Sequence, residues 1–448
     1  MRFEQDRLGY AFEDDYPESY GPADDARLRA IVPQQVGQLG STGRVADEKL
    51  LGILIGRRCG DQKRAQLEQR RRRDGVYTLV ARGEIVLDAD AYTAVKGLLA
   101  DYTQHPGTSG SHVRLRRPEF SAADVDRSVD ACAAAKVDAW PNYVATMAAV
   151  GKGIGGPEPA PPPPPPPPPP APPVTGLHAT RRSVRVAVID TGIAAQTRAD
   201  GLLGDVARTG GNIDRLDVLP AGPDGLLDYG AGHGTFVSGI IARVAPDATI
   251  SVYRAADTDG LGTDDEVADA ILRAYDDGAE IINLSLGIRT VDDQPPPAIA
   301  AAVESVRTRS GGATVIVAAA GNYGDRTTVF PAALDGVEAV AGLTAHLTPA
   351  AWSSYGDVQF STVAEGVHST FVQGTESPVF DPAPDAFGAD AWAIWSGTSF
   401  AAPQVAGAVA RISCEENIDV RAATARLAEY GKPIAGYGKA MRILKGIG

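Results

Sequence analysis

The chain has 448 residues, of which 44% are hydrophobic, enough for two domains with cores of their own. The formal net charge is −14 and most of the acidic excess follows residue 160, which argues against nucleic acid or an anionic membrane as the partner. The three cysteines are widely spaced and form neither a metal pattern nor a disulfide framework, as is typical of a reducing compartment. The charged start does not resemble a signal peptide and no apolar run has the about 18 residues of a membrane span, so we expect a soluble, cytoplasmic protein.

The first part of the chain predicts an arm followed by a small domain. Residues 1–48 are polar and rich in turn formers, so we expect an arm that is possibly without fixed structure. Residues 49–156 are expected to form a small α+β domain. Its strands are predicted at 77–81, 84–87, 113–117 and 140–146, and its helices run from 88 or 90 to about 102 and over 121–135.

A basic run over residues 63–73 contains four consecutive arginines. An RNA-binding strip is one interpretation of this run. Acidic residues interrupt it, however, and no aromatic residues accompany it for base stacking. The pattern therefore favours the solvated face of a helix.

Ten consecutive prolines, residues 161–170, mark the clearest boundary in the sequence. Such a run forms polyproline II, a stiff helix that rises about 3.1 Å per residue. We expect residues 157–174 to be a spacer between two domains, with a ligand for a proline-binding domain as the alternative. Proline runs also resist most endopeptidases, so cleavage within the spacer is not expected.

Residues 175–448 predict an α/β domain. Short apolar runs at 186–189, 250–253, 281–286 and 315–319 alternate with helical stretches at 263–278 and 297–309, the first of which opens with a Thr263–Glu266 capping box. Strands that are apolar on both faces belong to a parallel sheet flanked by helices. Ligands bind such sheets at the carboxyl ends of the strands.

Three polar residues fall at strand ends or helix starts in this domain. Asp190 ends an apolar strand, His233 lies between glycines at the head of an apolar helix, and Ser399 lies in a small-residue turn before an Ala-rich helix. Taken singly, they would be a capping carboxylate, a core histidine and an ordinary helix cap. Together they supply a carboxylate that orients an imidazole, a base with a pKa near neutrality and a hydroxyl nucleophile.

The segments around these residues resemble the three motifs of the subtilases, the subtilisin family of serine proteases, over residues from about 180 to 448. The matching segments are Val188-Ile189-Asp190-Thr191-Gly192, Gly232-His233-Gly234-Thr235 and Gly397-Thr398-Ser399. The resemblance implies a subtilisin-like catalytic domain in which Asp190 orients, His233 acts as general base and then acid, and Ser399 is the nucleophile. It also implies that Asn322, which ends Ala319-Ala320-Gly321-Asn322, holds the oxyanion together with the Ser399 N–H.

The same resemblance implies a cleft that binds an extended polypeptide by strand addition. Its two edges would be Ser285-Leu286-Gly287 and Gly260-Leu261-Gly262, where glycines permit close backbone approach, although both segments are also compatible with plain turns. Ala320 and Gly321 complete the predicted substrate-binding set. Val329 stands where broad-specificity relatives often have glycine, so we expect a shallow pocket for small side chains before the scissile bond.

Other features depart from the family pattern. The helix that starts at His233 runs on without the calcium-binding loop of secreted relatives, so we expect no calcium at that site and no other cofactor. Phe400 follows the nucleophile in place of the commoner methionine, which is a packing change. Residues 376–394 form a Pro- and Asp-containing loop that either shapes the leaving-group side of the cleft or is a surface excursion.

The role of the first domain stays open in the sequence. Subtilases usually carry an N-terminal prosegment that assists folding and inhibits the enzyme, and residues 113–146 faintly resemble half of such a unit. We prefer a retained regulatory or substrate-recruiting domain, with a cleaved prosegment as the alternative. For the whole chain we expect a serine endopeptidase acting on an intracellular protein or precursor peptide. The alternatives are a catalytically silent peptide-binding protein and a ligase or cyclase that passes the acyl-enzyme to an amine.

Overall fold

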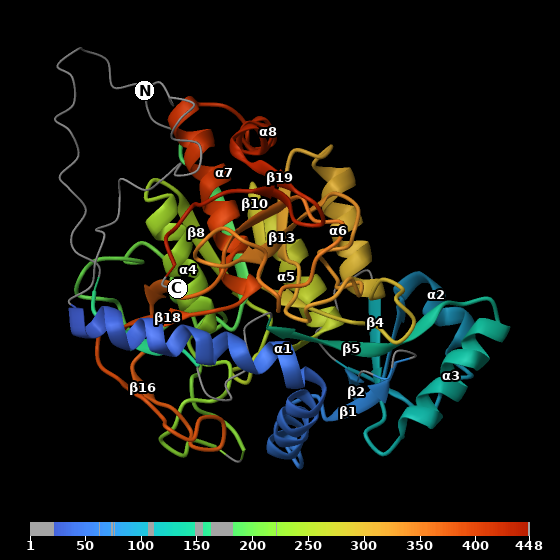
Figure 1. Ribbon diagram of the computed structural model, residues 1–448. Helices are drawn as coiled ribbons and strands as arrows, with labels where there is room; N and C mark the ends of the chain where they lie inside the picture. The colour runs from blue at the N-terminus through green and yellow to red at the C-terminus, as the bar shows by residue number, and fades with distance from the viewer. Residues whose placement is uncertain are drawn as a thin grey trace.

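The structure is a computed structural model that describes residues 22–61, 63–72, 75, 77–105, 112–147, 156–162, 182–220 and 222–446. An eight-stranded sheet lies at the centre of the domain formed by the second half of the chain (Figure 1). Its strands follow the order β19-β20-β14-β13-β12-β10-β7-β8. All neighbours are parallel except β19 and β20. The strands are β7 (Arg185–Asp190), β8 (Thr249–Arg254), β10 (Ile281–Leu284), β12 (Val315–Ala319), β13 (Val337–Leu343), β14 (Phe360–Val363), β19 (Lys432–Ile434) and β20 (Gly438–Ala440).

Helices cover both faces of this sheet because its strands are apolar on both sides. In β7, Val186 and Val188 join the core under one set of helices, whereas Ala187 and Ile189 join the core under the other. The first set is α4 (His233–Val244), α7 (Ala402–Glu416) and α8 (Val420–Tyr430). The second set is α5 (Asp264–Asp276) and α6 (Pro297–Arg309). The expected subtilisin-like α/β domain is therefore confirmed.

Shorter elements line the edges of this domain. The turn η3 (Thr398–Phe400) leads into α7. Two short strands lie beyond the main sheet, β9 (Leu261–Thr263) and β11 (Leu286–Gly287). Four more short strands are β15 (Val367–Thr370), β16 (Gly374–Thr375), β17 (Ala386–Phe387) and β18 (Trp392–Trp395). The segment 376–394, which was expected to be a loop, therefore contains β17 and most of β18.

The N-terminal domain is built on one long strand, β2 (Tyr77–Asp88), where the sequence predicted two. It pairs antiparallel with β1 (Leu67–Arg71), β4 (His112–Arg116) and β5 (Ala139–Met147), and β3 (Thr103–Gln104) extends the sheet beyond β4. The helices α2 (Ala89–Val95) and α3 (Ala122–Ala134) pack against this sheet. Asp88, one of the two predicted starts, is the N-cap of α2, which ends well before the expected residue 102, and Ser121 is the N-cap of α3.

The basic run was predicted wrongly as a helix face. Residues 67–71 of it form β1, whose five residues pair with Tyr77–Ala81 of β2. Two of the arginines have specific partners: Arg70 bonds Asp126, and Arg72 bonds Asp293 and the Thr290 carbonyl. The run therefore contributes ion pairs within the N-terminal domain and to the catalytic domain.

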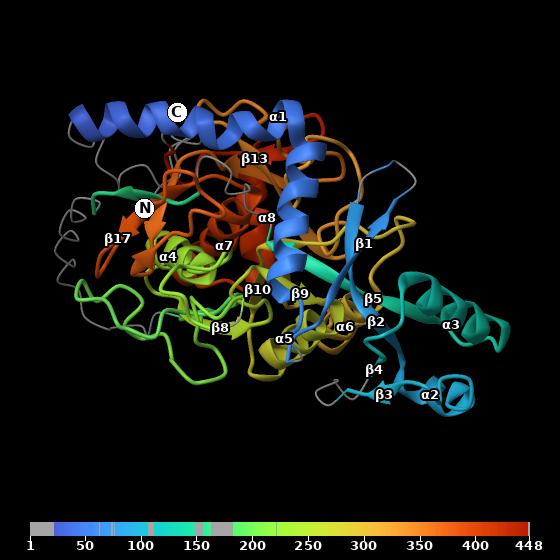
Figure 2. The same ribbon diagram turned by 90° about the horizontal axis from the view of Figure 1, so that it is seen from below.

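The expected arm and spacer also differ from the structure. A helix, α1 (Pro22–Arg58), occupies much of the segment expected to lack fixed structure; it runs along the catalytic domain and then turns toward β1 (Figure 2). Within the expected spacer 157–174, Glu158–Ala160 form β6, which pairs antiparallel with β18. The rest of that spacer from residue 163 onward lies outside the described residues.

Candidate active site

Asp190 and His233 form a buried pair at the carboxyl edge of the main sheet. Asp190 is the last residue of β7, and His233 is the first residue of α4. Their Oδ1 and Nδ1 atoms lie 2.7 Å apart, and the same Oδ1 accepts a 2.8 Å hydrogen bond from the Thr191 N–H. A carboxylate at this position favours a proton on Nδ1, which leaves Nε2 as the basic nitrogen of the ring.

A second buried carboxylate, Asp214, lies behind this pair. It accepts hydrogen bonds of 2.9 Å from both the Thr191 hydroxyl and the Gly232 N–H, so it ties the strand that ends at Asp190 to the start of α4. Burial raises the pKa of Asp214 to about 6, and the negative charge of Asp190 acts in the same direction. No sequence motif marks this residue, and only the structure reveals its position.

Ser399 lies in η3, immediately before α7, as the sequence predicted for a turn at a helix start. Its hydroxyl donates a 3.0 Å hydrogen bond to the Ser285 carbonyl, and the Ser285 hydroxyl donates a 2.8 Å bond back to the Ser399 carbonyl. His233 Nε2 has no hydrogen-bond partner among the described residues. Ser399 and the His233 ring are therefore not hydrogen-bonded to each other in this arrangement.

Aromatic rings join the histidine to the nucleophile turn. The Trp395 ring lies edge-on to the His233 ring at 5.6 Å, and the Phe400 ring lies at 5.4 Å from it. All three side chains are buried. The packing change at Phe400 that the sequence indicated thus places an aromatic ring next to the imidazole.

Asn322 lies next to the same turn. Its Oδ1 accepts hydrogen bonds from the Thr398 N–H at 3.0 Å and from the Thr398 hydroxyl at 2.8 Å. Because two donors converge on Oδ1, the orientation of the amide is fixed and Nδ2 is its donor end. Gly321 is held to this group as well, because its N–H lies 3.2 Å from the Thr398 hydroxyl oxygen.

The two predicted substrate-binding edges both pair with β5 of the N-terminal domain. On one side, Val144, Ala145 and Thr146 lie opposite Thr263, Gly262 and Leu261 of β9. On the other side, Thr146 and Met147 lie opposite Gly287 and Leu286 of β11. The last residues of β5 are thus the middle strand of a three-stranded antiparallel sheet, in the register that strand addition requires.

The backbone conformation at Gly260, next to β9, favours glycine at this position. Its φ is +79°, and a Cβ at this position would lie 2.5 Å from the Met147 side chain. The Met147 N–H donates a 3.1 Å hydrogen bond to the Gly260 carbonyl. The strand in the cleft therefore lies directly against the Gly260 backbone, whose positive φ would strain any larger residue.

Val329 fills the space between two other glycines of the predicted site. Its Cγ1 lies 2.7 Å from where a Cβ of Gly287 would be, and its Cγ2 lies 3.1 Å from that of Gly321. Val329 is 3% exposed, and Ala320 of the predicted set is also buried. The methyl groups of Val329 occupy volume that glycine would leave open.

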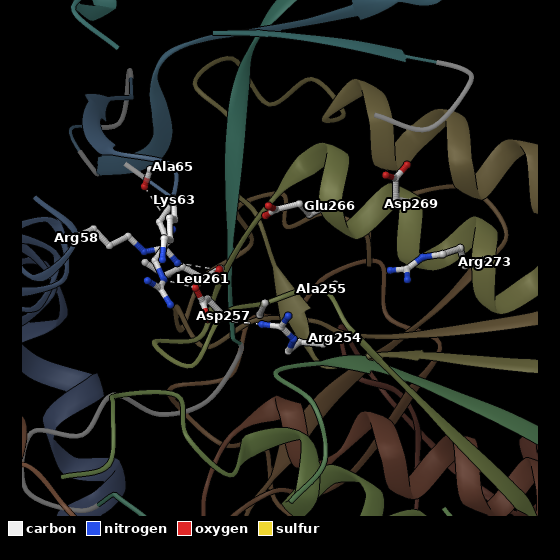
Figure 3. Close-up of a pocket in the computed structure, with 12 residues that line it drawn as sticks. Arg58, Lys63, Ala65, Arg254, Ala255, Asp257, Leu261, Glu266, Asp269 and Arg273 are labelled. Atoms are coloured by element: carbon white, nitrogen blue, oxygen red, sulfur yellow. Dashed lines mark hydrogen bonds and ion pairs between the residues drawn. The ribbon is translucent and has the colours of Figure 1, made fainter. Parts of the chain in front are cut away.

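Ion pairs attach the N-terminal domain beside the cleft. Arg58 donates two hydrogen bonds, of 2.6 and 2.7 Å, to Asp259, and Arg64 pairs with Asp257. A hollow of about 450 Å³ lies next to these pairs, and Figure 3 shows basic side chains from both domains lining it. Residues 254–257 and Leu261 line part of it, and its lining includes neither Asp190, His233 nor Ser399.

Two further properties concern the described residues alone. None of their helices combines the length and apolar character that crossing a bilayer would need. Cys59, Cys132 and Cys414 are all free thiols.

A parallel sheet with helices on both faces, and with these residues at its carboxyl edge, defines the class of subtilisin-like serine proteases. The chain belongs to the subtilase family, whose profile matches residues 181–427. Similar proteins include a thermophilic serine proteinase of Bacillus sp. (strain AK1), 35% identical over 257 residues, and subtilisin DY of Bacillus licheniformis, 30% identical over 245 residues. The matches cover 54% and 51% of this chain, and 56% and 76% of those two proteins.

The fold is also similar to that of fervidolysin from Fervidobacterium pennivorans, a keratinolytic enzyme related to subtilisin. That comparison has a TM-score of 0.57 and 20% identity, and it covers 82% of this chain and 60% of fervidolysin. The chain thus spans only slightly more than half the length of some relatives.

Proposed function

We propose that this protein is a serine endopeptidase that hydrolyses peptide bonds through an acyl-enzyme on Ser399. The observation that carries the proposal is the buried 2.7 Å contact between Asp190 and His233, beside a serine turn and a cleft that holds an extended strand. In this proposal Asp190 fixes the tautomer of His233 and stabilises the imidazolium that forms during the reaction.

One rearrangement is required before the first chemical step. In the proposal, the Ser399 hydroxyl turns from the Ser285 carbonyl toward His233 Nε2 by a change between staggered χ1 wells. Oγ then attacks the substrate carbonyl carbon while Nε2 takes its proton. The imidazolium returns that proton to the leaving amine when the C–N bond breaks, and a water molecule hydrolyses the ester by the same sequence.

Asn322 is proposed to stabilise the negative oxygen of the tetrahedral intermediate. Thr398 fixes its amide with Nδ2 as the donor end, so no reorientation is needed as charge develops. The backbone N–H of Ser399 is proposed as the second donor, as the family resemblance implies.

The N-terminal domain is proposed to act as an inhibitor of its own catalytic domain. Its strand β5 pairs with both edges of the cleft, so a substrate cannot bind there until β5 leaves. Met147 is the last residue of β5, and Ala148 follows it in the sequence. A cut by Ser399 after Ala148 would have a small side chain before the scissile bond and would separate β5 from the catalytic domain.

The proposed substrate is a polypeptide in extended conformation with a small side chain before the scissile bond. Val329 supports the size preference because its methyl groups occupy the space between Gly287 and Gly321. A cytoplasmic location and an intracellular protein or precursor peptide as substrate are part of the proposal. The three free thiols support it, because reducing compartments keep cysteines in this state.

The test is hydrolysis of a fluorogenic peptide carrying the sequence Val-Ala-Thr-Met-Ala of residues 144–148, with wild type and Ser399→Ala compared. Hydrolysis by wild type alone supports the proposal. Peptide binding without hydrolysis in both proteins would identify a silent binding protein, and transfer of the acyl group to an added amine in preference to water would identify a ligase. The intact masses of purified wild type and purified Ser399→Ala then show whether Ser399 removes the N-terminal domain or the domain is retained.

A further inference from the structure

The segment between β18 and α7 connects to both proposed catalytic groups. Trp395, the last residue of β18, lies against the His233 ring, and four residues later the chain reaches Ser399. Phe400 then packs on Trp395 at 5.1 Å and on the His233 ring at 5.4 Å. A displacement of this segment would therefore move the nucleophile and the imidazole relative to each other.

Ser396, the residue that leads from β18 into the nucleophile turn, is held from outside the catalytic domain. Its hydroxyl donates a 2.7 Å hydrogen bond to Oε1 of Gln35 in α1, and it accepts a 3.0 Å bond from the Gly366 N–H. The Gln35 amide nitrogen donates a 2.8 Å bond to the Gly156 carbonyl. Ser396 is fully buried and Gln35 is 1% exposed, so water does not replace either partner.

The surroundings of Gln35 form a layer over β18. One turn earlier in α1, Val32 packs on Ile394 of β18, and both side chains are buried. On the edge of β18, Glu158 of β6 pairs with Ile394 in the antiparallel ladder. The nucleophile segment is thus enclosed by two elements that precede the catalytic domain in sequence.

The far end of α1 is attached to the catalytic domain by contacts that do not involve β5. Arg57 donates a 2.9 Å hydrogen bond to Asp228, and Arg58 forms its two bonds with Asp259. Asp228 and Asp259 are both buried. Departure of β5 from the cleft would remove the packing of Val144 against Leu54 of α1, but the Arg57, Arg58 and Gln35 hydrogen bonds do not involve β5.

We propose that Gln35 is a positioning residue for the nucleophile turn, and that α1 remains bound in the working enzyme while β5 is the part that leaves. This inference rests on the proposed function. Without Gln35 the buried Ser396 hydroxyl loses its acceptor and must find another by shifting the turn. A shift of the turn misplaces Ser399 against the bound substrate, and rate is sensitive to such misplacement.

The experiment compares Gln35→Met with Gln34→Ala in the full chain, using the Val-Ala-Thr-Met-Ala peptide. Methionine keeps the size of the buried side chain and removes its hydrogen bonds. Gln34 is the matched control, because it is exposed and, among the described residues, its amide bonds within its own helix, to the Ala30 carbonyl. We expect Gln35→Met to lower kcat about 10-fold with KM unchanged, and Gln34→Ala to leave both constants as in wild type.

A double-mutant cycle with Ser396→Ala supplies the second measurement. If Gln35 acts through the Ser396 hydroxyl, the two substitutions together lower kcat no more than either does alone. Additive losses, or an unchanged kcat in Gln35→Met, would overturn the proposal. Should Gln35→Met fail to fold, an unchanged kcat in Ser396→Ala overturns it equally. Absence of hydrolysis by wild type would instead refute the proposed function, so the two failures are distinguishable.

Discussion

At the scale of single residues, the site depends on groups whose orientation is fixed before substrate arrives. Asn322 is the clearest example, because two hydrogen bonds from Thr398 set its amide. The hydroxyl of Ser399 is the exception, since its hydrogen bond goes to the Ser285 carbonyl. The proposed chemistry therefore needs one side-chain rotation and otherwise uses a preorganised site.

Substitution of Asn322 by alanine tests the proposed oxyanion donor. We expect kcat on the peptide substrate to fall by about 10²–10³, with KM little changed, because the lost hydrogen bond strengthens only as the oxyanion forms. Steady-state kinetics of wild type and variant measure the effect. A KM that rises while kcat holds would assign Asn322 to substrate binding alone.

Val329→Gly tests the proposed size limit before the scissile bond. Glycine would open the space between Gly287 and Gly321, so peptides with Phe or Tyr at this position should gain about 10–200-fold in kcat/KM relative to Ala. Thr328→Gly, one residue earlier, is the control for added backbone freedom. A wild-type library profile already led by Phe or Tyr would refute the size limit.

At the scale of elements, β5 joins the two domains most directly. It is a strand of the N-terminal sheet at one end and a strand between β9 and β11 at the other. The sequence predicted this strand over 140–146 from its own apolar pattern. Its second set of partners follows only from the three-dimensional arrangement, because β9 and β11 lie more than a hundred residues further along the chain.

Thr146→Pro should weaken the hold of β5 on the cleft. Proline removes a backbone donor from a strand that is paired on both edges, whereas Thr146→Val keeps the backbone and the side-chain volume. We expect the proline variant to hydrolyse added peptide faster than wild type, and the valine variant to match wild type. Equal rates in all three proteins would mean that β5 does not limit access to the cleft.

The docking of β6 should depend on pH through Glu158. Burial, together with the nearby Asp385 and Glu376, raises the pKa of Glu158 from about 4.5 to about 8, although Arg27 acts in the opposite direction. In the docked strand, the Glu158 carboxyl therefore keeps its proton up to about pH 8, whereas in the unfolded chain it loses the proton near pH 4.5. The stabilisation that comes from this bound proton is complete below pH 4.5 and is lost as pH rises toward 8.

The measurement is the thermal unfolding midpoint of wild type and Glu158→Gln between pH 5 and 9. We expect the unfolding midpoint of Glu158→Gln to rise relative to that of wild type as pH increases, because glutamine carries no charge into the partly buried site. Glu304→Gln, on the exposed surface of α6, is the control. A difference between wild type and Glu158→Gln that does not vary with pH would contradict the assignment.

At the scale of the whole molecule, local sequence patterns predicted the catalytic domain well. Strand 315–319 and helix 297–309 match the observed bounds, and the Thr263–Glu266 capping box opens α5 as expected. These elements carry their own signals, namely continuous apolar runs, cap residues and terminal prolines. The motif residues could be found because the three motif segments are short and contiguous.

Two of the elements that were missed, α1 and β6, depend on partners far along the chain, whereas β13, β14 and α8 were also not predicted. The apolar residues of α1 do not follow one face, and its buried contacts at Val32 and Gln35 are with β18, more than 350 residues later. β6 lies in a proline-containing stretch whose sequence does not indicate a strand, and it is extended because it pairs with β18. Asp214 and Gln35 likewise belong to no motif, so the site's supporting residues could not be predicted from the sequence.

Labelling of the serine by a fluorophosphonate is the most direct test of the central claim, that Asp190, His233 and Ser399 act together as a nucleophilic site. Mass spectrometry of peptides from the labelled protein identifies the modified residue. We predict modification at Ser399 in wild type, faster modification in Thr146→Pro, and loss of modification in Ser399→Ala and His233→Ala. Labelling at another residue, or equal labelling of Ser399 in wild type and His233→Ala, would contradict the account.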